Sequence, residues 1–318
     1  MRSVRTVLLL PLCLAVAASA SAAVLVPVPS VPNSSITTVF AINDGNVVAG
    51  SYIGASDGIE HSFFGPLGSY TSFDAGTGGS EARGINNKGV ITGFSNSQGG
   101  NTATEPAFER KGDGKIVNVT MSGQQLYGQA QGIAALGNMY AGTRWDFGEH
   151  EAVAFVGRGG NWKRDVRIPD VHQASTAGGI NSSGVVVGSY FQPPTHGFMG
   201  SGNKLATVDY PSGDSQGTTL EGINDRGLAV GQWSDSSGNT HSFLYDPATS
   251  AFTDINVSGA SNVYAWAINA AGAVAVSSDA GSYIWCMKKK QCPSGGRTEL
   301  RAPVLPVRAP ETHALYQK

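Results

Sequence analysis

Three histidines recur at one place in a repeated pattern and are the first residues to suggest chemistry. His61, His196 and His241 each stand two residues before a phenylalanine. Three histidines that met at one point would bind zinc, but every ligand must then lie about 2 Å from the ion. Equivalent positions in different strands are held much farther apart than that. The pattern therefore favours histidines that hydrogen-bond a loop of their own repeat, and we expect no metal and no cofactor.

A second set of candidates lies two residues before each of six recurring isoleucines. This position varies from repeat to repeat and is occupied by Phe40, Arg83, Gln131, Gly178, Glu221 and Trp266. The next residue is always glycine or alanine. If the six repeats are arranged around one axis, these varying side chains surround the mouth of a central channel. Aromatic residues then form one side of the mouth, and polar and charged residues form the opposite side. Sugars and small polar ligands bind such surfaces, so Phe40, Arg83, Gln131, Glu221 and Trp266 form a candidate ligand site. The alternative is that they only fill the channel and that Arg83 pairs with Glu221.

Other motifs for catalysis or cofactor binding are missing from the sequence. No Gly-x-Ser-x-Gly stands at a strand-to-helix turn, and the glycine-rich stretch 76–80 lacks the helix that a phosphate-binding loop requires. The loops at 57–60 and 235–239 lack the ligand spacing of a calcium loop. We expect no catalytic residues on this basis, although carboxylates brought together in space would escape such a search.

The isoleucines belong to a short sequence that occurs six times. Ile42, Ile85, Ile133, Ile180, Ile223 and Ile268 are separated by 43, 48, 47, 43 and 45 residues. A period of this length is typical of a small β-unit repeated in tandem. In five copies an asparagine follows the isoleucine, and we expect it to hydrogen-bond the turn that it begins.

The fifth repeat shows the structure of one unit most clearly. Extended segments at 220–224, 228–233, 240–245 and 251–257 are separated by turns rich in Gly, Asp, Ser and Pro. This pattern predicts a four-stranded antiparallel meander. No segment has a sustained helical stripe of apolar residues, so the sequence predicts an all-β protein with almost no helix.

A single meander cannot bury both of its faces, whereas six around an axis can. We therefore predict a six-bladed β-propeller of four-stranded blades over residues 23–292. The small residue before each isoleucine marks the innermost strand, where space is least. The last repeat lacks an outer strand, and the N-terminal segment 24–30 is expected to supply it and close the ring. Closure by 298–306 and an open β-solenoid are the alternatives.

The first 22 residues predict a secretory signal peptide. They combine Arg2 and Arg5, an apolar stretch from Val7 to Ala17, and a small-x-small cleavage site at 20–22. No later apolar run is long enough for a membrane helix. The mature protein is expected outside the cytoplasm, in the periplasm or the medium. Residues 293–318, rich in Pro, Arg and Ala, are expected to form a flexible tail.

Charge and cysteine content narrow the class of protein further. Without Arg2 and Arg5 the chain has 19 basic and 23 acidic residues, which argues against a nucleic-acid partner. The mature part contains two cysteines, Cys286 and Cys292. In an oxidising compartment an even pair predicts a disulfide, here one that fastens the end of the last repeat.

The repeated Gly-Ile-Asn-x-x-Gly-x-Val-Val-Gly, followed by His-x-Phe, resembles the HAF family of extracellular repeats. The histidine motif matches at His61, His196 and His241, while Pro106 and Val153 replace it in repeats 2 and 3. Repeat 3 also carries Ala134 in place of the asparagine. The resemblance covers about residues 36–287. It implies a secreted bacterial protein and no particular activity.

The sequence favours a non-catalytic, monomeric propeller that binds or scaffolds an extracellular glycan or an envelope protein. The alternative is a polysaccharide hydrolase or lyase with its site at the channel mouth. A purely structural role in an extracellular matrix is a third reading. Two or more carboxylates around the axis would favour the enzyme, and an aromatic floor without them would favour the binder.

Overall fold

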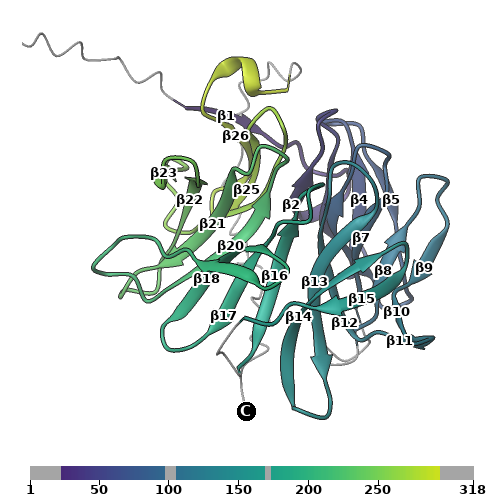
Figure 1. Cartoon of the computed structure of the whole chain (residues 1–318). Coiled ribbons are helices and arrows are strands. Elements are labelled where there is room, and N and C mark those ends of the chain that lie inside the picture. Colours follow the sequence, from purple (N-terminus) through teal and green to yellow (C-terminus); the bar gives the residue numbers. More distant parts are fainter. Residues whose placement is uncertain (1–22, 97–104, 169–172, 294–318) are drawn as a thin grey trace, which may run out of the picture.

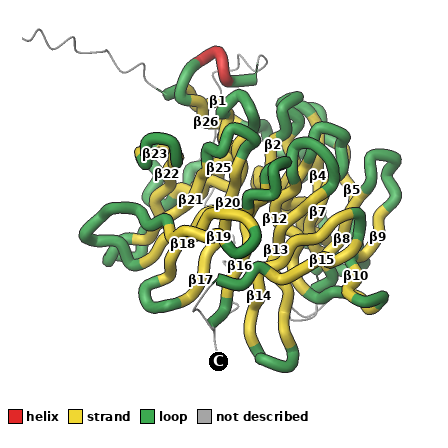
Figure 2. The backbone as a smooth tube through the Cα atoms, viewed as in Figure 1, coloured by secondary structure: helices red, strands yellow, loops and turns green. Residues whose placement is uncertain are grey.

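The computed structural model describes residues 23–96, 105–168 and 173–293, and within them the protein is all-β. The one helical element in these ranges is the short 3-10 turn η2 (Lys289–Gln291). The strands form antiparallel sheets that stand side by side around a common middle (Figures 1 and 2). The predicted fold class is therefore confirmed as all-β. The predicted signal peptide and all of the predicted tail except Pro293 lie outside the described residues.

Each of the first three repeats forms one sheet, named here by its repeat. The repeat-1 sheet contains β2 (Ser34–Ile42), β3 (Val48–Gly54), β4 (Glu60–Gly65) and β5 (Thr71–Phe73). The repeat-2 sheet contains β6 (Ser80–Ile85), β7 (Ile91–Ser95), β8 (Ala107–Arg110) and β9 (Ile116–Asn118). The repeat-3 sheet contains β12 (Gly128–Ile133), β13 (Met139–Asp146), β14 (Glu151–Arg158) and β15 (Asn161–Asp165), with two extra short strands, β10 (Thr120–Met121) and β11 (Gln124–Gln125).

The later repeats follow the same order of strands. The repeat-4 sheet contains β16 (Ser175–Ile180), β17 (Val186–Phe191), β18 (Thr195–Ser201) and β19 (Lys204–Thr207). The repeat-5 sheet contains β20 (Gly217–Ile223), β21 (Ala229–Ser234), β22 (Thr240–Asp246) and β23 (Ala251–Ile255). One parallel bridge, between Thr195 and Gly217, joins these two sheets. The four strands predicted for the fifth repeat are thus confirmed, with ends shifted by a few residues.

The repeat-6 sheet takes its outer strand from the other end of the chain. It contains β24 (Val263–Ile268), β25 (Ala273–Ser278) and β26 (Gly281–Cys286), and β1 (Val24–Pro27) pairs antiparallel with β26. Pro27 lies at the end of this edge strand, where its missing N–H removes no hydrogen bond from the sheet interior. The beginning and the end of the described chain are therefore held together by backbone pairing.

Apolar side chains fill the spaces between neighbouring sheets. The first strand of each sheet contacts the first strand of the next, and β24 contacts β2. Separate clusters of buried residues lie between consecutive repeats, and one of them joins Val39 and Phe63 of repeat 1 to Ile284 of repeat 6. The recurring isoleucines belong to these clusters or pack against them. A single sheet cannot bury both of its faces by itself. The apolar contacts between sheets therefore hold neighbouring repeats together.

The recurring asparagines join neighbouring sheets as well as their own turns. Four of the five Oδ1 atoms accept two backbone N–H groups of their turn; Asn224, for example, bonds Arg226 at 3.0 Å and Leu228 at 3.1 Å. The Oδ1 of Asn269 accepts the N–H of Ala273 at 2.9 Å. The turn bonding expected from the sequence is therefore confirmed. In addition, each Nδ2 donates to a backbone carbonyl of the next repeat. In the last repeat, Asn269 Nδ2 donates to the carbonyl oxygen of Asn43 in the first repeat at 3.1 Å. Repeat 3, which has Ala134, uses Leu136 N to Ser182 Oγ at 3.0 Å.

Candidate functional site

The variable residues of the candidate site are β-bulge residues. Where each first strand pairs with the second, the register skips one residue, and the skipped residues are Phe40, Arg83, Gly178, Glu221 and Trp266. In repeat 3 the skip spans both Gln131 and Gly132. A bulge bends its strand and re-aims the extra side chain. This local geometry directs the variable side chains away from the ladder.

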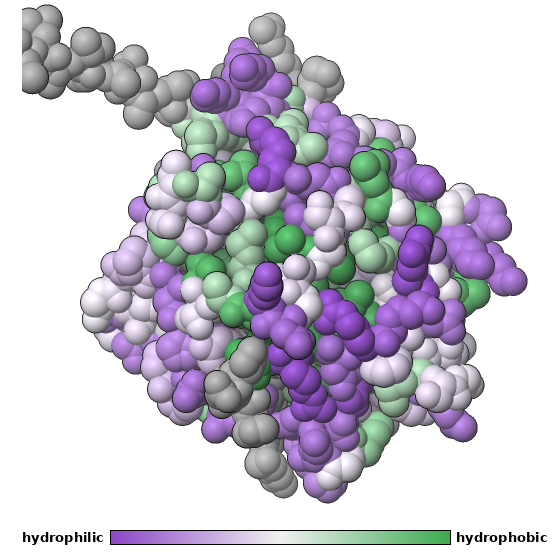
Figure 3. All heavy atoms as spheres, viewed as in Figure 1, coloured by the Kyte–Doolittle hydropathy of each residue, from purple (hydrophilic) through white to green (hydrophobic). Residues whose placement is uncertain are grey.

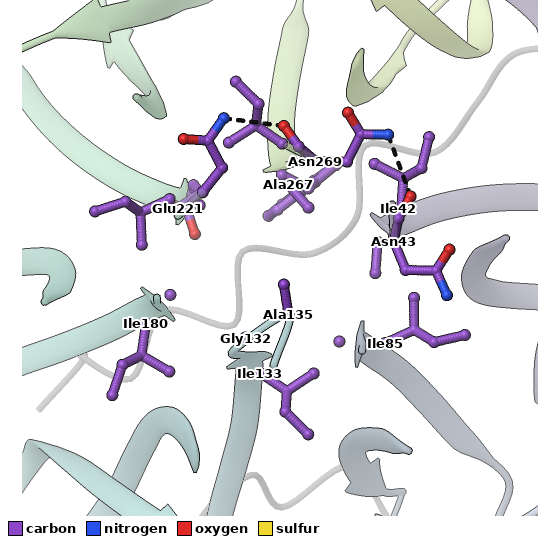
Figure 4. Close-up of a pocket in the computed structure, with 18 of the residues that line it drawn as sticks. Ile42, Asn43, Ile85, Gly132, Ile133, Ala135, Ile180, Glu221, Ala267 and Asn269 are labelled. Carbon is purple, nitrogen blue, oxygen red and sulfur yellow. Dashed lines mark hydrogen bonds between the residues drawn. The ribbon is translucent and has the colours of Figure 1, made fainter. Parts of the chain in front are cut away.

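The small residue after each bulge lies where neighbouring first strands come closest. A Cβ added to Gly222 would lie 2.7 Å from the carbonyl oxygen of Trp266, and one added to Gly132 would lie 2.6 Å from that of Gly178. The limited space predicted for these strands is therefore set by the backbone of the next sheet. In Figure 4 the labelled isoleucines around the channel point away from its middle.

A small cavity opens at the end of the channel where the asparagine turns lie. It measures about 60 Å³ and is lined by residues of the first strands and of the turns that follow them, among them Arg83, Glu221 and Trp266 and the turn carboxylates Asp44 and Asp225. Phe40 and Gln131 are not among its lining residues. A cavity needs about 15 Å³ to hold one water, so this one admits a few waters. It is too small to enclose a sugar ring, which would have to rest across the mouth.

The prediction that the aromatic side chains face the charged ones across the channel is wrong for Arg83. Its cationic side chain packs against Phe40 and Trp266. Phe40, only 2% exposed, meets the Trp266 ring edge-on at 5.2 Å. The Arg83 guanidinium lies 4.0 Å from the centre of the Phe40 ring and 5.4 Å from that of Trp266. Trp266 Nε1 also donates to Ser277 Oγ at 2.8 Å. Cation–π contact between adjacent repeats therefore holds these three side chains.

The Arg83–Glu221 ion pair considered as the alternative is not formed. Arg83 Nη2 instead lies 2.5 Å from a carboxylate oxygen of Glu81, two residues earlier on the same strand. Burial raises the pKa of Glu221, although a hydrogen bond with Thr219 and the charge of Arg83 act in the opposite direction. Gln131 is turned toward Gln129, whose Oε1 accepts its amide at 2.6 Å. Of the predicted residues, the structure thus brings only Arg83, Glu221 and Trp266 to the cavity.

A largely buried carboxylate pair, Glu60 and Glu81, interacts with Arg83, and sequence spacing does not predict this pair. Glu60, on the third strand of repeat 1, accepts hydrogen bonds from Ser51 Oγ at 2.5 Å and Asn96 Nδ2 at 3.1 Å. Burial and the neighbouring charge of Glu81 raise the pKa of Glu60 to about 7. Glu81 is two residues from Arg83, a spacing that puts both on one side of the strand, but nothing in the sequence places Glu60 beside them.

This pair should make stability fall as the pH rises. Because the folded-state pKa of Glu60 lies above its unfolded value, the native protein binds the extra proton, and that stabilisation is lost as pH passes 7. Between pH 5 and pH 8, wild type should lose about 1–2 kcal/mol relative to Glu60→Gln, a figure reduced for partial solvent contact. Urea unfolding at the two pH values measures this difference. Asp113→Asn, at an exposed turn carboxylate, is the control, and parallel stability curves for wild type and Glu60→Gln would disprove the prediction.

The three recurring histidines bond carboxylates of their own repeats, as predicted. His61 contacts Asp57 at 3.2 Å and Asp74 at 3.0 Å, His196 contacts Asp209 at 2.7 Å, and His241 contacts Asp235 at 2.9 Å. Each ring also lies against an aromatic residue of the adjacent strand, Tyr52, Tyr190 or Trp233. In the described ranges no three His, Cys, Asp or Glu side chains converge as metal ligands.

The predicted disulfide between Cys286 and Cys292 is confirmed, with its Cα atoms 5.6 Å apart. It connects the end of β26 to the residue after η2, and so fastens the last strand as expected. Disulfides persist in oxidising compartments, which fits an extracellular or periplasmic protein. Among the helices of the described chain, none is long and apolar enough to cross a membrane.

Comparison with known proteins supports the fold class. No family model and no curated protein matches the chain. TolB from Acinetobacter baumannii has a similar structure, with a TM-score of 0.51 and 10% identity over 76% of this chain and 64% of that one. The chain therefore spans somewhat less than two thirds of that protein. The likeness, together with the arrangement of the sheets, assigns the chain to the β-propeller folds.

Two other solved structures align with lower similarity. The WD40 β-propeller domain of Doa1 gives a TM-score of 0.40 at 10% identity, over 84% of this chain and 98% of that one. The fucose-specific lectin from Aleuria aurantia gives 0.42 at 10% identity, over 83% and 100%. Matches at this level describe the fold alone and identify no particular protein.

Proposed function

We propose that this protein is a secreted, monomeric, six-bladed β-propeller, closed by its N-terminal strand, that binds an extracellular glycan or another envelope component. The repeat count, the pairing of β1 with β26 and the bond from Asn269 to Asn43 support the closed ring. The start of β1 at Val24, two residues after the predicted cleavage site, supports removal of residues 1–22. The HAF-like repeats support an extracytoplasmic setting.

The observation that carries the binding role is the cavity at the channel mouth. Its lining comes from first strands and turns that hydrogen bonds join from repeat to repeat, so the groups that differ between repeats, Arg83, Glu221 and Trp266, are presented on a rigid frame. A glycan lying across the mouth would place one hydroxyl-bearing substituent in the cavity, where it would take the place of water. Preorganised polar groups beside an aromatic ring suit that task.

A glycan array probed with the mature protein tests this role. Glu221→Gln keeps the shape of the side chain and removes its charge, and Trp266→Ala removes the aromatic wall. Each should weaken binding at least tenfold, while Lys204→Gln, on the exposed β19 hairpin, should bind like wild type. Because Trp266→Ala also removes packing, its unfolding temperature is measured alongside. Undiminished binding by both variants would exclude the channel mouth, and an empty array would exclude glycans.

The second candidate function is a polysaccharide hydrolase or lyase, and the carboxylates near the channel favour it. Glu221 lies in the cavity with a raised pKa, and Glu60 and Glu81 lie close by. A carboxyl group with a raised pKa is suited to donate a proton. Neither Glu60 nor Glu81 lines the cavity, however. The other carboxylates in its lining, Asp44 and Asp225, accept hydrogen bonds from neighbouring repeats. Release of new sugar ends by wild type, lost at least a hundredfold in Glu221→Gln, would establish the enzyme instead.

A further inference from the structure

A larger cavity lies away from the channel, at the outer side of the repeat-5 sheet. It measures about 280 Å³, close to the lower end of the range for small-molecule sites. Strands β22 and β23 and the turn before β21 form one wall, and Met287, Lys288 and Gln291 form the other. It shares no lining residue with the cavity at the channel mouth. A ligand here would be bound independently of the channel.

The floor of this outer cavity is apolar. Leu228, Leu244 and Met287 line it, and all three belong to or pack against the core cluster that includes the buried Trp285. Leu244 is only 6% exposed, so its position is fixed by the core. No aromatic side chain lines the cavity. The floor therefore suits an aliphatic or aromatic body better than the face of a sugar, which usually stacks on an aromatic ring.

Two hydrogen-bond donors converge at the rim above Gly272. Gln291 Nε2 and Arg226 Nη2 lie 3.0 Å and 3.2 Å from the point that a Cβ on Gly272 would occupy. In the described part of the chain neither nitrogen has a hydrogen-bond or ion-pair partner. Their approach is possible because residue 272 has no side chain. Two N–H donors on one rim, one of them from a guanidinium, are the groups that bind the oxygens of a carboxylate.

The charge around the rim has the sign that an anion requires. Arg226 and Lys288 line the cavity, and Lys289 and Lys290 follow directly, in a protein whose net charge is −2. The one carboxylate in the lining, Asp246, accepts the backbone N–H of Ala248 at 3.0 Å in its own turn. A local positive field on a negative protein attracts anions to that place.

The disulfide positions the second wall. Cys286 ends the buried strand β26, and its bond to Cys292 closes a short loop that contains Met287, Lys288 and Gln291. Backbone N–H of Lys288 also donates to Gln291 Oε1 at 2.7 Å, which turns the amide nitrogen of Gln291 toward Gly272. A wall fixed in this way loses little conformational entropy when a ligand binds.

We infer that this outer cavity is a binding site for a small organic carboxylate with an apolar body. Its carboxylate takes the donors of Arg226 and Gln291 with Lys288 alongside, and its body lies on Leu228, Leu244 and Met287. The same carboxylate chemistry occurs in a free organic acid and in an acidic sugar unit. The apolar floor favours the free acid.

Calorimetry with benzoate, and with its neutral counterpart benzamide, tests the site in the mature protein. Benzoate should bind at millimolar concentration or better, and benzamide at least tenfold more weakly. Arg226→Gln should weaken benzoate at least tenfold, whereas Lys290→Gln, next to the lining but outside it, should change it less than twofold. Glucuronate should bind more weakly than benzoate. The methyl NMR signal of Met287, assigned with Met287→Leu, should shift with benzoate and locate the ligand.

Several outcomes would overturn the inference. These are no benzoate binding by folded wild type at 10 mM, equal binding of benzamide, unchanged benzoate binding by Arg226→Gln, or an unmoved Met287 signal. If glucuronate binds more tightly than benzoate, the inference of a free organic acid is wrong and the ligand is an acidic sugar. Since Arg226 is exposed, circular dichroism of Arg226→Gln is expected to match wild type and confirms that the comparison is between folded proteins.

Discussion

Replacing Gly231 with alanine is expected to destabilise the protein by about 3 kcal/mol or more, and valine there should prevent folding. Gly231 stands opposite Phe243 and just past the bulge at Glu221. Its added Cβ would lie 2.2 Å from the carbonyl oxygen of Thr219 and 2.8 Å from the Phe243 ring. Neither neighbour can move easily, because the oxygen belongs to the bulged backbone and the ring is fully buried. Urea unfolding measures the loss.

A second glycine provides the control for this prediction. Gly213 has no atom within 4 Å of its added Cβ and does not have a positive φ. Gly213→Ala should therefore change stability by less than about 0.5 kcal/mol. If Gly231→Ala were as mild as Gly213→Ala, the close approach of the bulged strand to its partner would be wrong. The same approach recurs at Gly50, Gly93, Gly142 and Gly188, so each of these positions should respond like Gly231.

Removing the side chain of Asn269 is expected to reduce stability by about 2–3 kcal/mol. Its Oδ1 accepts Ala273 N at 2.9 Å, and its Nδ2 donates to Asn43 O at 3.1 Å. The residue is 3% exposed, so Asn269→Ala removes a buried acceptor of the Ala273 N–H and one of the two donors to Asn43 O, which also accepts Asn46 N. The lost Nδ2 bond joins the last repeat to the first. Urea unfolding and proteolysis of the β1 segment should both report the loosened contact.

Asn87 provides a matched asparagine for comparison. It also bonds the neighbouring repeat, through Asp44 N at 3.0 Å and Asp44 Oδ2 at 2.7 Å, but it is exposed. Water replaces those bonds when they are lost, so Asn87→Ala should cost less than about 1 kcal/mol. An Asn269→Ala variant as stable as Asn87→Ala would show that the asparagine series contributes little to holding the sheets together.

The repeat pattern accounted for most of the fold. The period of the isoleucines and the turns between extended segments predicted all-β meanders, and the fifth repeat shows them at nearly the expected residues. Local chemistry was sufficient here, because turn residues and alternation act within one unit. The extra strands β10 and β11 were not predicted, since short polar segments such as 120–125 pair only when a neighbouring strand is offered.

The candidate site was predicted less well than the fold. The sequence identified the six variable positions, and the structure explains them as bulge residues, but Phe40 and Gln131 do not reach the cavity. Phe40 is buried under Arg83, and Gln131 turns to Gln129. These differences arise because rotamers and partners in the channel depend on side chains from several repeats, whose distances no sequence spacing supplies.

The sequence by itself determined the β-unit, its number of copies, the inward strand, the disulfide pair and the turn role of the asparagines. Those features follow from local preferences and from a period that every copy repeats. Only the tertiary structure decided that the asparagine amides bond the next sheet, that Glu60 lies beside Glu81, and that an apolar cavity with unpaired donors forms beside the disulfide. Each of these joins residues from different repeats, and their proximity is set by how the sheets pack around the axis.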